Sequence, residues 1–298
     1  MKKKPEGSVS HTPARHSGRK TAESTGRSFS STSARPDAKS TAPSAAESSI
    51  DQPDQPDLGS ARASTRAADV QNELRALADP SQATHLARFF KTGPGEYGEG
   101  DRFLGIRVPE QRKIAKKHRD LPLDDVAVLV RSEYHEERLT GLLILTYRYP
   151  KSTPEQKEAL FNFYVAHIPW INNWDLVDVT APNIVGAWLT GRPRRQLYEW
   201  AGSENLWERR IAILSTLHFI RQDDFEDTMQ LAEILLNDTH DLIHKAVGWM
   251  LREAGKRNQD VLISFLEEHS HRMPRTMLRY AIERLLEPQR QGYLSRGK

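Results

Sequence analysis

The sequence predicts an all-α fold in which helix pairs stack into an α-solenoid, and three observations lead to this prediction. Apolar residues recur at three- and four-residue spacing through most of the chain after residue 66. No stretch alternates apolar and polar residues between turn signals, as a half-buried strand would. Similar helical segments also recur at a nearly constant interval, which is typical of a repeat protein.

Residues 1–66 differ in composition from the rest of the chain. They are rich in Ser, Ala, Thr, Pro and charged residues and contain almost no aromatic or large aliphatic side chains. Such a segment cannot bury enough apolar surface to offset the entropy lost on ordering. We therefore expect residues 1–66 to be a disordered basic tail and residues 67–298 to be the folded domain, which is long enough for a sizeable core.

The net charge of +3 is unevenly distributed along the chain. Residues 1–40 hold nine Lys or Arg and three acidic residues, so the remainder carries a net charge of −3. An argument for nucleic-acid binding by the folded domain must therefore rest on local clusters of cations. The tail could add weak, salt-dependent attraction to phosphates, or it could serve only as a solubilising extension.

Composition also excludes several classes of protein. The chain has no cysteine, which removes disulfides, cysteine-ligated zinc, iron–sulfur clusters and cysteine nucleophiles. No run approaches about 18 apolar residues, so we expect no membrane span. His240 and His244 have the spacing of metal ligands, but no third ligand accompanies them. We therefore expect neither a metal nor a cofactor.

The helices are predicted from residue 70 onward. Apolar spacing indicates helices over residues 70–79, 81–91, 108–119 and 135–149, and Ser–Thr–Pro–Glu starts another over 152–168. Between the second and third lies a glycine-rich stretch, GPGEYGEGDRFLGIR. A glycine-rich loop before a helix can bind phosphate, but this one lacks the strand and the Gly-Lys-Ser/Thr ending of a nucleotide P-loop. We expect an ordered loop that packs Tyr97 and Phe103.

The repeat becomes visible when Arg138, Trp174, Arg210 and Lys245 are aligned. These residues are 36, 36 and 35 positions apart, and each lies in an apolar helical segment. Further helices are expected between them, at about 153–168, 192–201, 223–236 and 257–270. A helix pair every 36 or so residues is typical of a solenoid of the HEAT or armadillo kind. The aligned helices would form the inner, concave layer, where residues distant in sequence converge.

The segment NNWDLVDVTAPNIVGAWL, residues 172–189, places a carboxylate and an indole on one helix face. Trp174 and Asp178 are four residues apart, and Asp is rarely buried without a partner. Asp178 could simply pair with an arginine of a neighbouring repeat, or it could be an anionic group in a cleft. Together with Trp249 on the inner layer, the arrangement suits a cationic guest, because aromatic faces attract cations.

Clusters of arginine and lysine recur at the ends or inner faces of successive repeats. Any one of them is explained by a solvated face or a helix C-terminus, but the set along a concave surface suits a phosphate backbone. We expect DNA contacts from five cations: Arg209, Arg210, Arg252, Lys256 and Arg275.

Several stretches, taken together, resemble the AlkD-like DNA alkylation repair proteins. These stretches are NNWDLVD, WERRIAIL, KAVGWMLREAGK and MPRTMLRYAIE, preceded by FLGIRVPEQR, and the resemblance covers about residues 70–290. It implies a DNA glycosylase of HEAT-like repeats that removes cationic N3- and N7-alkylated purines from duplex DNA. It further implies a catalytic Asp178, flanking Trp174 and Trp249, and backbone contacts by Arg210 and Arg252. Some family members lack the catalytic aspartate and are weak or inactive, whereas this sequence keeps it.

The same resemblance implies a bacterial cytoplasmic protein associated with the nucleoid. A concave DNA-binding cleft needs only one copy of the chain, so we expect a monomer. Because no nucleophilic lysine is evident near the predicted cleft, we expect base removal without strand nicking. Two alternatives stay open. One is a non-catalytic DNA-binding scaffold that recognises distorted or branched DNA, and the other is a protein-interaction solenoid, the commonest use of such arrays.

Overall fold

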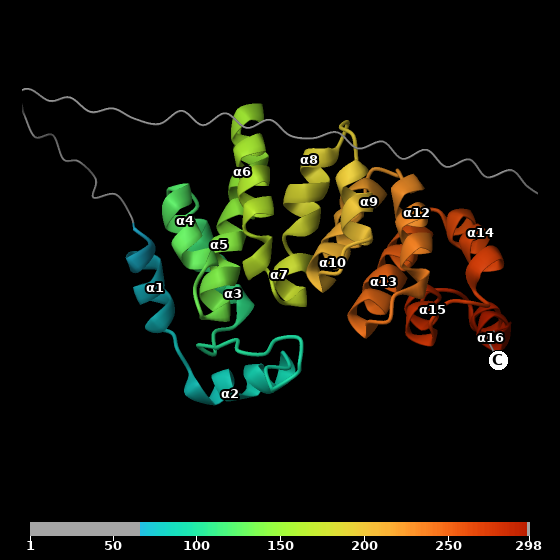
Figure 1. Ribbon diagram of the computed structural model, residues 1–298, viewed down its shortest axis with the longest axis horizontal. Helices are drawn as coiled ribbons and strands as arrows, with labels where there is room; N and C mark the ends of the chain where they lie inside the picture. Colours follow the sequence, from blue (N-terminus) through green and yellow to red (C-terminus); the bar gives the residue numbers. More distant parts are fainter. Residues whose placement is uncertain (1–65, 297–298) are drawn as a thin grey trace, which may run out of the picture. The chain divides into compact units, whose positions relative to one another are not determined.

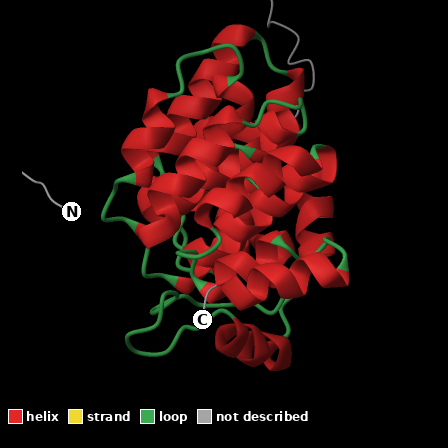
Figure 2. Ribbon diagram, turned by 90° about the vertical axis from the view of Figure 1, so that its right-hand side faces the viewer, coloured by secondary structure: helices red, strands yellow, loops and turns green. Residues whose placement is uncertain are grey.

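The computed structural model describes residues 66–296, and every regular element in this range is a helix (Figure 2). The only strand-like pairing among these residues is an isolated bridge between Arg102 and Tyr134. None of these helices is both long enough and apolar enough to cross a lipid bilayer. The tail predicted for residues 1–66 lies outside the described residues, apart from Arg66 at the start of the first helix.

The first half of the described chain contains six α-helices and a glycine-rich loop. The helices are α1 (Ala67–Arg75), α2 (Pro80–Phe89), α3 (Val108–Lys117), α4 (Leu123–Val130), α5 (His135–Arg148) and α6 (Pro154–Ala166). Short 3-10 turns follow α5 and α6, at Tyr149–Lys151 and Ile168–Trp170. The second half contains α7 (Trp174–Asp178), a π-helical turn (Pro182–Gly186), α8 (Ala187–Leu189), α9 (Arg195–Ala201), α10 (Leu206–Ser215), α11 (Leu217–Ile220), α12 (Glu226–Ile234), a 3-10 turn (Leu235–Asn237), α13 (Asp241–Arg257), α14 (Gln259–His269), α15 (Arg275–Ala281) and α16 (Glu287–Arg296).

From α3 onward the helices form a row that broadly follows the order of the sequence, with α2 apart from it, and this arrangement confirms the predicted α-solenoid (Figure 1). Helix α7 packs against both α5 and α10, and α13 packs against both α10 and α15. Helices α9, α12 and α14 form a second layer against α10 and α13. The aligned residues of the repeat fall in α5, α7, α10 and α13, so they belong to one layer as predicted.

The core lies between the two layers and is built from the apolar stripes of the helices. Four consecutive residues of α5, Leu142–Leu145, are fully buried, because this helix is surrounded on several sides. The approach of α13 to α15 depends on a glycine. A Cβ atom at Gly248 would lie 2.5 Å from the Met277 carbonyl oxygen, so a larger residue would force the two helices apart.

Two local features differ from the expected helices. Helix α4 was not predicted, because LDDVAVLV is too short and too uniformly apolar to show a clear period. The helix predicted to carry Trp174 and Asp178 on one face is short and ends at Asp178. Pro182 has no N–H to donate to the carbonyl of Asp178, so the α-helical ladder stops and a π-helical turn follows. Asp178 is thereby placed at a helix end.

A buried carboxylate connects the glycine-rich loop to the start of α5. Glu136 is 1 % exposed and accepts three backbone N–H groups, from Leu104 (2.9 Å), Gly105 (2.8 Å) and Ile106 (3.2 Å). The chain can turn here because Gly105 adopts a φ of +88° and passes close to α2, where any Cβ atom would lie 2.1 Å from the Asp79 carbonyl oxygen. The carboxylate therefore fixes the loop that leads into α3.

We predict that the substitution Glu136→Gln lowers the free energy of unfolding by about 2 kcal/mol or more, because an amide presents an N–H to buried N–H donors. Glu110→Gln is the control, since Glu110 is an exposed partner of Lys113 and should change the free energy by no more than about 0.5 kcal/mol. Urea unfolding measures the free energy of both variants. If the two substitutions had equal effects, the Glu136 carboxylate would not be the group that fixes the loop.

Candidate functional site

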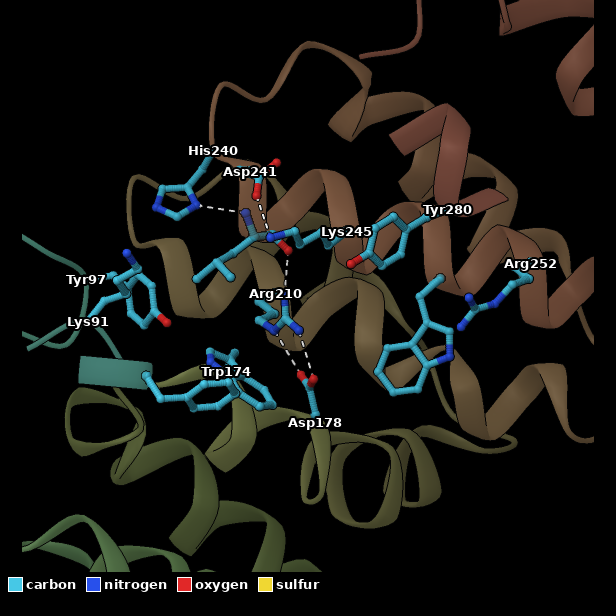
Figure 3. Close-up of a pocket in the computed structure, with 13 residues that line it drawn as sticks. Lys91, Tyr97, Trp174, Asp178, Arg210, His240, Asp241, Lys245, Arg252 and Tyr280 are labelled. Atoms are coloured by element: carbon cyan, nitrogen blue, oxygen red, sulfur yellow. Dashed lines mark hydrogen bonds and ion pairs between the residues drawn. The ribbon is translucent and has the colours of Figure 1, made fainter. Parts of the chain in front are cut away.

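A pocket of about 600 Å³ opens on the face formed by α7, α10 and α13 (Figure 3). The end of α2, the glycine-rich loop and α15 complete its walls. Its lining residues are Phe89, Lys91, Tyr97, Trp174, Asp178, Arg210, His240, Asp241, Leu242, Lys245, Trp249, Arg252 and Tyr280. The fold thus brings together Asp178, Trp174, Trp249, Arg210 and Arg252, as the sequence predicts.

An ion pair between two neighbouring helices lies in the wall of this pocket. The guanidinium of Arg210 on α10 donates from Nε to Asp178 Oδ1 (2.9 Å) and from Nη2 to Asp178 Oδ2 (2.8 Å) (Figure 3). Its third nitrogen donates to the carbonyl oxygen of Leu242 on α13. The side chains of Arg210 and Asp178 are 5 % and 14 % exposed. The pairing of Asp178 with an arginine is therefore real, and the carboxylate still faces the pocket.

Burial and pairing act on Asp178 in opposite directions. Burial raises the pKa of Asp178 above its ordinary value, whereas the Arg210 guanidinium opposes the rise by favouring the carboxylate. Because all three nitrogens of Arg210 have protein partners, the position of this side chain is strongly determined. This arrangement favours a role for Arg210 in holding Asp178 over a direct contact to a DNA phosphate.

Aromatic side chains hold Trp174 in place beside Asp178. The ring of Trp174 stacks on Phe90, with ring centroids 5.2 Å apart, and meets the edge of Phe89 at 6.0 Å. Trp249 lies on α13, and its indole Nε1 donates to Glu253 (3.0 Å) on the same helix. Both indoles line the pocket that contains Asp178. The two aromatic side chains and the carboxylate that were predicted to lie together therefore share one cavity.

A buried charged network lies behind Trp174. The imidazole of His135 is 2 % exposed and contacts the carboxylates of Asp175 (2.8 Å) and Asp101 (3.4 Å). The Arg138 guanidinium contacts Asp101 in turn (2.7 Å). The imidazole ring is also tilted against the ring of Phe90, with centroids 5.0 Å apart, and Trp174 stacks on the same phenyl ring. This network therefore joins α5, the glycine-rich loop and the first turn of α7 into one support for the pocket wall.

The four other predicted DNA contacts occupy different positions. The guanidinium of Arg252 lies in the pocket and pairs with Glu283. Lys256 pairs with Glu253 (2.7 Å) beside a neighbouring hollow that shares Trp249 with the pocket. Arg209 and Arg275 are not among the lining residues of the pocket. Arg209 pairs with Asp238 (2.7 Å), and Arg275 donates to the carbonyl of Leu294 (3.0 Å).

Sequence reasoning missed several side chains of the pocket, including Phe89, Lys91, Tyr97, Lys245 and Tyr280. The repeat alignment did contain a signal for Lys245, which occupies the position of Trp174 and Arg210. Two lysines, Lys91 and Lys245, therefore line the pocket, whereas the prediction concerned only a nucleophilic lysine. Lys245 is nevertheless a poor nucleophile, because its hydrogen bond to Asp241 raises the pKa of Lys245 and keeps the amine charged.

Comparison with known proteins places this geometry in context. Residues 70–285 match the sequence model of the family described as DNA alkylation repair enzyme. A predicted DNA alkylation repair enzyme from Enterococcus faecalis has a similar fold, with a TM-score of 0.57 at 18 % identity over 70 % of this chain and 97 % of that chain. AlkD2 from Streptococcus mutans aligns with a TM-score of 0.45 at 15 % identity, over 74 % of this chain and 97 % of that one. No curated protein matches the chain significantly.

The buried network predicts a characteristic dependence of stability on pH. Burial disfavours the charged imidazole, but the Asp175 and Asp101 carboxylates outweigh this effect and raise the pKa of His135 to about 9. A raised pKa stabilises the fold fully below the ordinary value of 6.5, and this contribution is lost as the pH rises through about 9. The loss should be on the order of 3 kcal/mol in the free energy of unfolding.

Urea unfolding at a series of pH values between 6 and 10 gives the free energy of unfolding of the unsubstituted protein and of His135→Asn. The asparagine cannot gain a proton, so this variant lacks the contribution of the charged imidazole. The difference in stability between the two proteins should shrink across this range. A constant difference would show that folding does not raise the pKa of His135.

Proposed function

This chain belongs to the family of DNA alkylation repair enzymes, and from that premise we propose that it is a monofunctional DNA glycosylase. Its substrates are cationic N3- and N7-alkylated purines in duplex DNA, and its domain of HEAT-like repeats spans residues 67–298. The observation that carries the proposal is the carboxylate of Asp178, held by Arg210 on the wall of a pocket that Trp174 and Trp249 also line.

The chemistry of an alkylated purine explains why one carboxylate is enough. The base already carries a positive charge, so it becomes neutral as its bond to C1′ breaks and needs no proton to depart. Glycosidases that act on neutral leaving groups require a second carboxyl group as general acid. In this reaction the enzyme needs only to stabilise the positive charge that develops on the deoxyribose and to position a water molecule.

Asp178 supplies both contributions in this mechanism. A carboxylate about 4 Å from a unit positive charge stabilises it by roughly 4 kcal/mol at an effective dielectric constant of about 20, which corresponds to on the order of a thousandfold in rate. Each carboxylate oxygen accepts one hydrogen bond from Arg210 and keeps a further lone pair, which can orient the attacking water. The fixed position of the pair means that little reorganisation accompanies the reaction.

The two indoles act on the same positive charge. An aromatic face stabilises a nearby cation by about 0.5–2 kcal/mol, more when water is excluded. The stack of Phe90 on Trp174 holds one indole in a defined plane, and the hydrogen bond to Glu253 orients the other. In this mechanism Trp174 and Trp249 contact the sugar or the lesion as the glycosidic bond stretches, and they keep bulk water away from Asp178.

Duplex DNA is the partner that fits the cations of this face. Lys91, Lys245 and Arg252 line the pocket, and Lys256 lies beside it. We keep Arg209, Arg210 and Arg275 as proposed DNA-binding residues, with Arg210 acting chiefly through Asp178. One copy of the chain contains the whole pocket, so the proposed enzyme acts as a monomer.

A second candidate is a non-catalytic scaffold that binds distorted or branched DNA through the same cations. The observation in its favour is that both oxygens of Asp178 already bind Arg210, which suits a purely structural ion pair. The two candidates differ in what they require of Asp178. A scaffold needs only the pair, whereas a glycosylase needs the negative charge.

We predict that the substitution Asp178→Asn abolishes release of N7-methylguanine from a duplex, lowering the single-turnover rate by about a thousandfold, while duplex affinity changes little. Asp227→Asn is a matched control. Asp227 is 13 % exposed and is held by Arg194, much as Asp178 is 14 % exposed and held by Arg210, but it lies outside the pocket. Release by Asp227→Asn should match that of the unsubstituted protein.

Chromatography of the released base and a parallel binding assay give both quantities. If the unsubstituted protein binds the duplex but releases no base, the scaffold is the better account. Equal release by the unsubstituted protein and Asp178→Asn would remove Asp178 from the mechanism.

A further inference from the structure

The first part of the glycine-rich loop, residues 93–101, is firmly attached to the body of the domain. At its end, the buried Asp101 contacts the Arg138 guanidinium and accepts a hydrogen bond from Asn172 (2.7 Å each). At its middle, the Gly98 N–H donates to the Lys91 carbonyl (3.0 Å). A Cβ atom at Gly98 would lie 2.6 Å from the Phe90 carbonyl oxygen, so only glycine permits this approach. The loop therefore has a defined path.

That path carries Tyr97 into the pocket, beyond the simple packing expected for it. Its ring is partly buried and meets the edge of Trp207, with ring centroids 6.1 Å apart. Its hydroxyl points into the cavity that contains Trp174 and Arg210 (Figure 3). Burial raises the pKa of Tyr97, and the Trp174 side chain opposes that rise. The phenol keeps its proton at neutral pH and can donate it.

The hydroxyl of Tyr97 has no acceptor for that proton within residues 66–296, since none of the hydrogen bonds found there has Tyr97 Oη as its donor. Two other donors of the pocket are already engaged, Arg210 with Asp178 and Leu242, and Trp249 with Glu253. A half-buried hydroxyl with an unused proton inside a pocket is a place where a ligand oxygen can bind.

The charges around Tyr97 indicate which kind of ligand oxygen its hydroxyl would bind. The Asp175 and Glu96 carboxylates raise the pKa of Tyr97 and the Lys245 ammonium lowers it, while Lys91 and Lys245 both line the pocket and neither Asp175 nor Glu96 does. The Asp241 carboxylate would repel an anion, but the Lys245 Nζ neutralises it at 2.7 Å from Oδ2. The Lys91 Nζ forms a similar ion pair with Glu96 Oε1, at 3.7 Å. Both pairs are substantially exposed, so they contribute little and leave the ammonium groups able to turn to a ligand. A phenol donor in a pocket that two ammonium groups also line suits a phosphate oxygen.

We propose that the glycine-rich loop is a substrate-contacting element and that the Tyr97 hydroxyl donates a hydrogen bond to a DNA phosphate beside the lesion. The inference rests on the proposed function, because it takes damaged duplex DNA as the occupant of the pocket. Contacts to phosphates fix the register of a protein on DNA without reading its sequence. In this position the contact sets the deoxyribose of the lesion against Asp178, so Tyr97 is a positioning residue for base release.

The substitution Tyr97→Phe tests the hydroxyl and keeps the ring against Trp207. The probe is a duplex containing 2′-fluoro-N7-methylguanosine, whose glycosidic bond resists hydrolysis, so that binding is measured without reaction. We expect about tenfold weaker binding, the typical effect of losing a hydrogen bond to a charged acceptor, with unchanged thermal unfolding. Tyr198→Phe is the control, since its hydroxyl binds Asp227 and Gln230 outside the pocket, and its affinity for the duplex should be unchanged.

A set of duplexes with one phosphate at a time replaced by methylphosphonate then identifies the acceptor. At one position near the lesion, the replacement should weaken binding of the unsubstituted protein about tenfold and that of Tyr97→Phe hardly at all. The proposal is overturned if Tyr97→Phe binds the duplex as tightly as the unsubstituted protein. It is also overturned if, at every phosphate, the methylphosphonate weakens binding of both proteins by the same factor. These binding results are independent of base release, so a protein that fails to release base would contradict the proposed function and leave the assignment of Tyr97 to be decided by the binding data.

Discussion

The ion pair between Asp178 and Arg210 is the interaction on which the rest of the site depends. It joins α7 to α10, and the third nitrogen of the same guanidinium reaches the Leu242 carbonyl on α13, so one side chain connects three helices of the inner layer. A buried carboxylate without a partner would be protonated or excluded, and removing one partner of a buried pair typically costs about 3–5 kcal/mol. The pair therefore allows a negative charge to remain in a largely buried position.

The surroundings of this pair are arranged to limit motion. Pro182 ends α7 directly after Asp178, so the carboxylate lies at a helix end facing the pocket. Behind it, the charged network around His135 and the stack of Phe90 on Trp174 leave the pocket wall few alternative conformations. A site held by a second layer of buried contacts is pre-organised, which is what stabilisation of a developing cation requires.

The sequence predicts the solenoid and much of the site because both depend on periodicity. Trp174, Arg210 and Lys245 recur at the repeat interval, and a constant interval places residues in one layer. The contribution of the glycine-rich loop was not predictable in the same way. Its path depends on Asp101 reaching residues 34 and more positions away, a non-local contact that no periodicity encodes. For this reason Tyr97 was expected to pack, and its place in the pocket emerged only from the structure. The boundary between the tail, residues 1–66, and the folded domain, residues 67–298, also stays a prediction.

The central claim is that Asp178 stabilises positive charge, and the charge of the leaving base tests it most directly. Single-turnover base release can be compared for N7-methylguanine and for hypoxanthine, a neutral base, at the same position of one duplex. The account predicts release of free N7-methylguanine well above the spontaneous rate, no acceleration for hypoxanthine, and no strand nick. Equal acceleration of both bases would contradict it, because a neutral base requires a proton donor that this mechanism does not contain. The absence of acceleration for either base would contradict the glycosylase assignment itself.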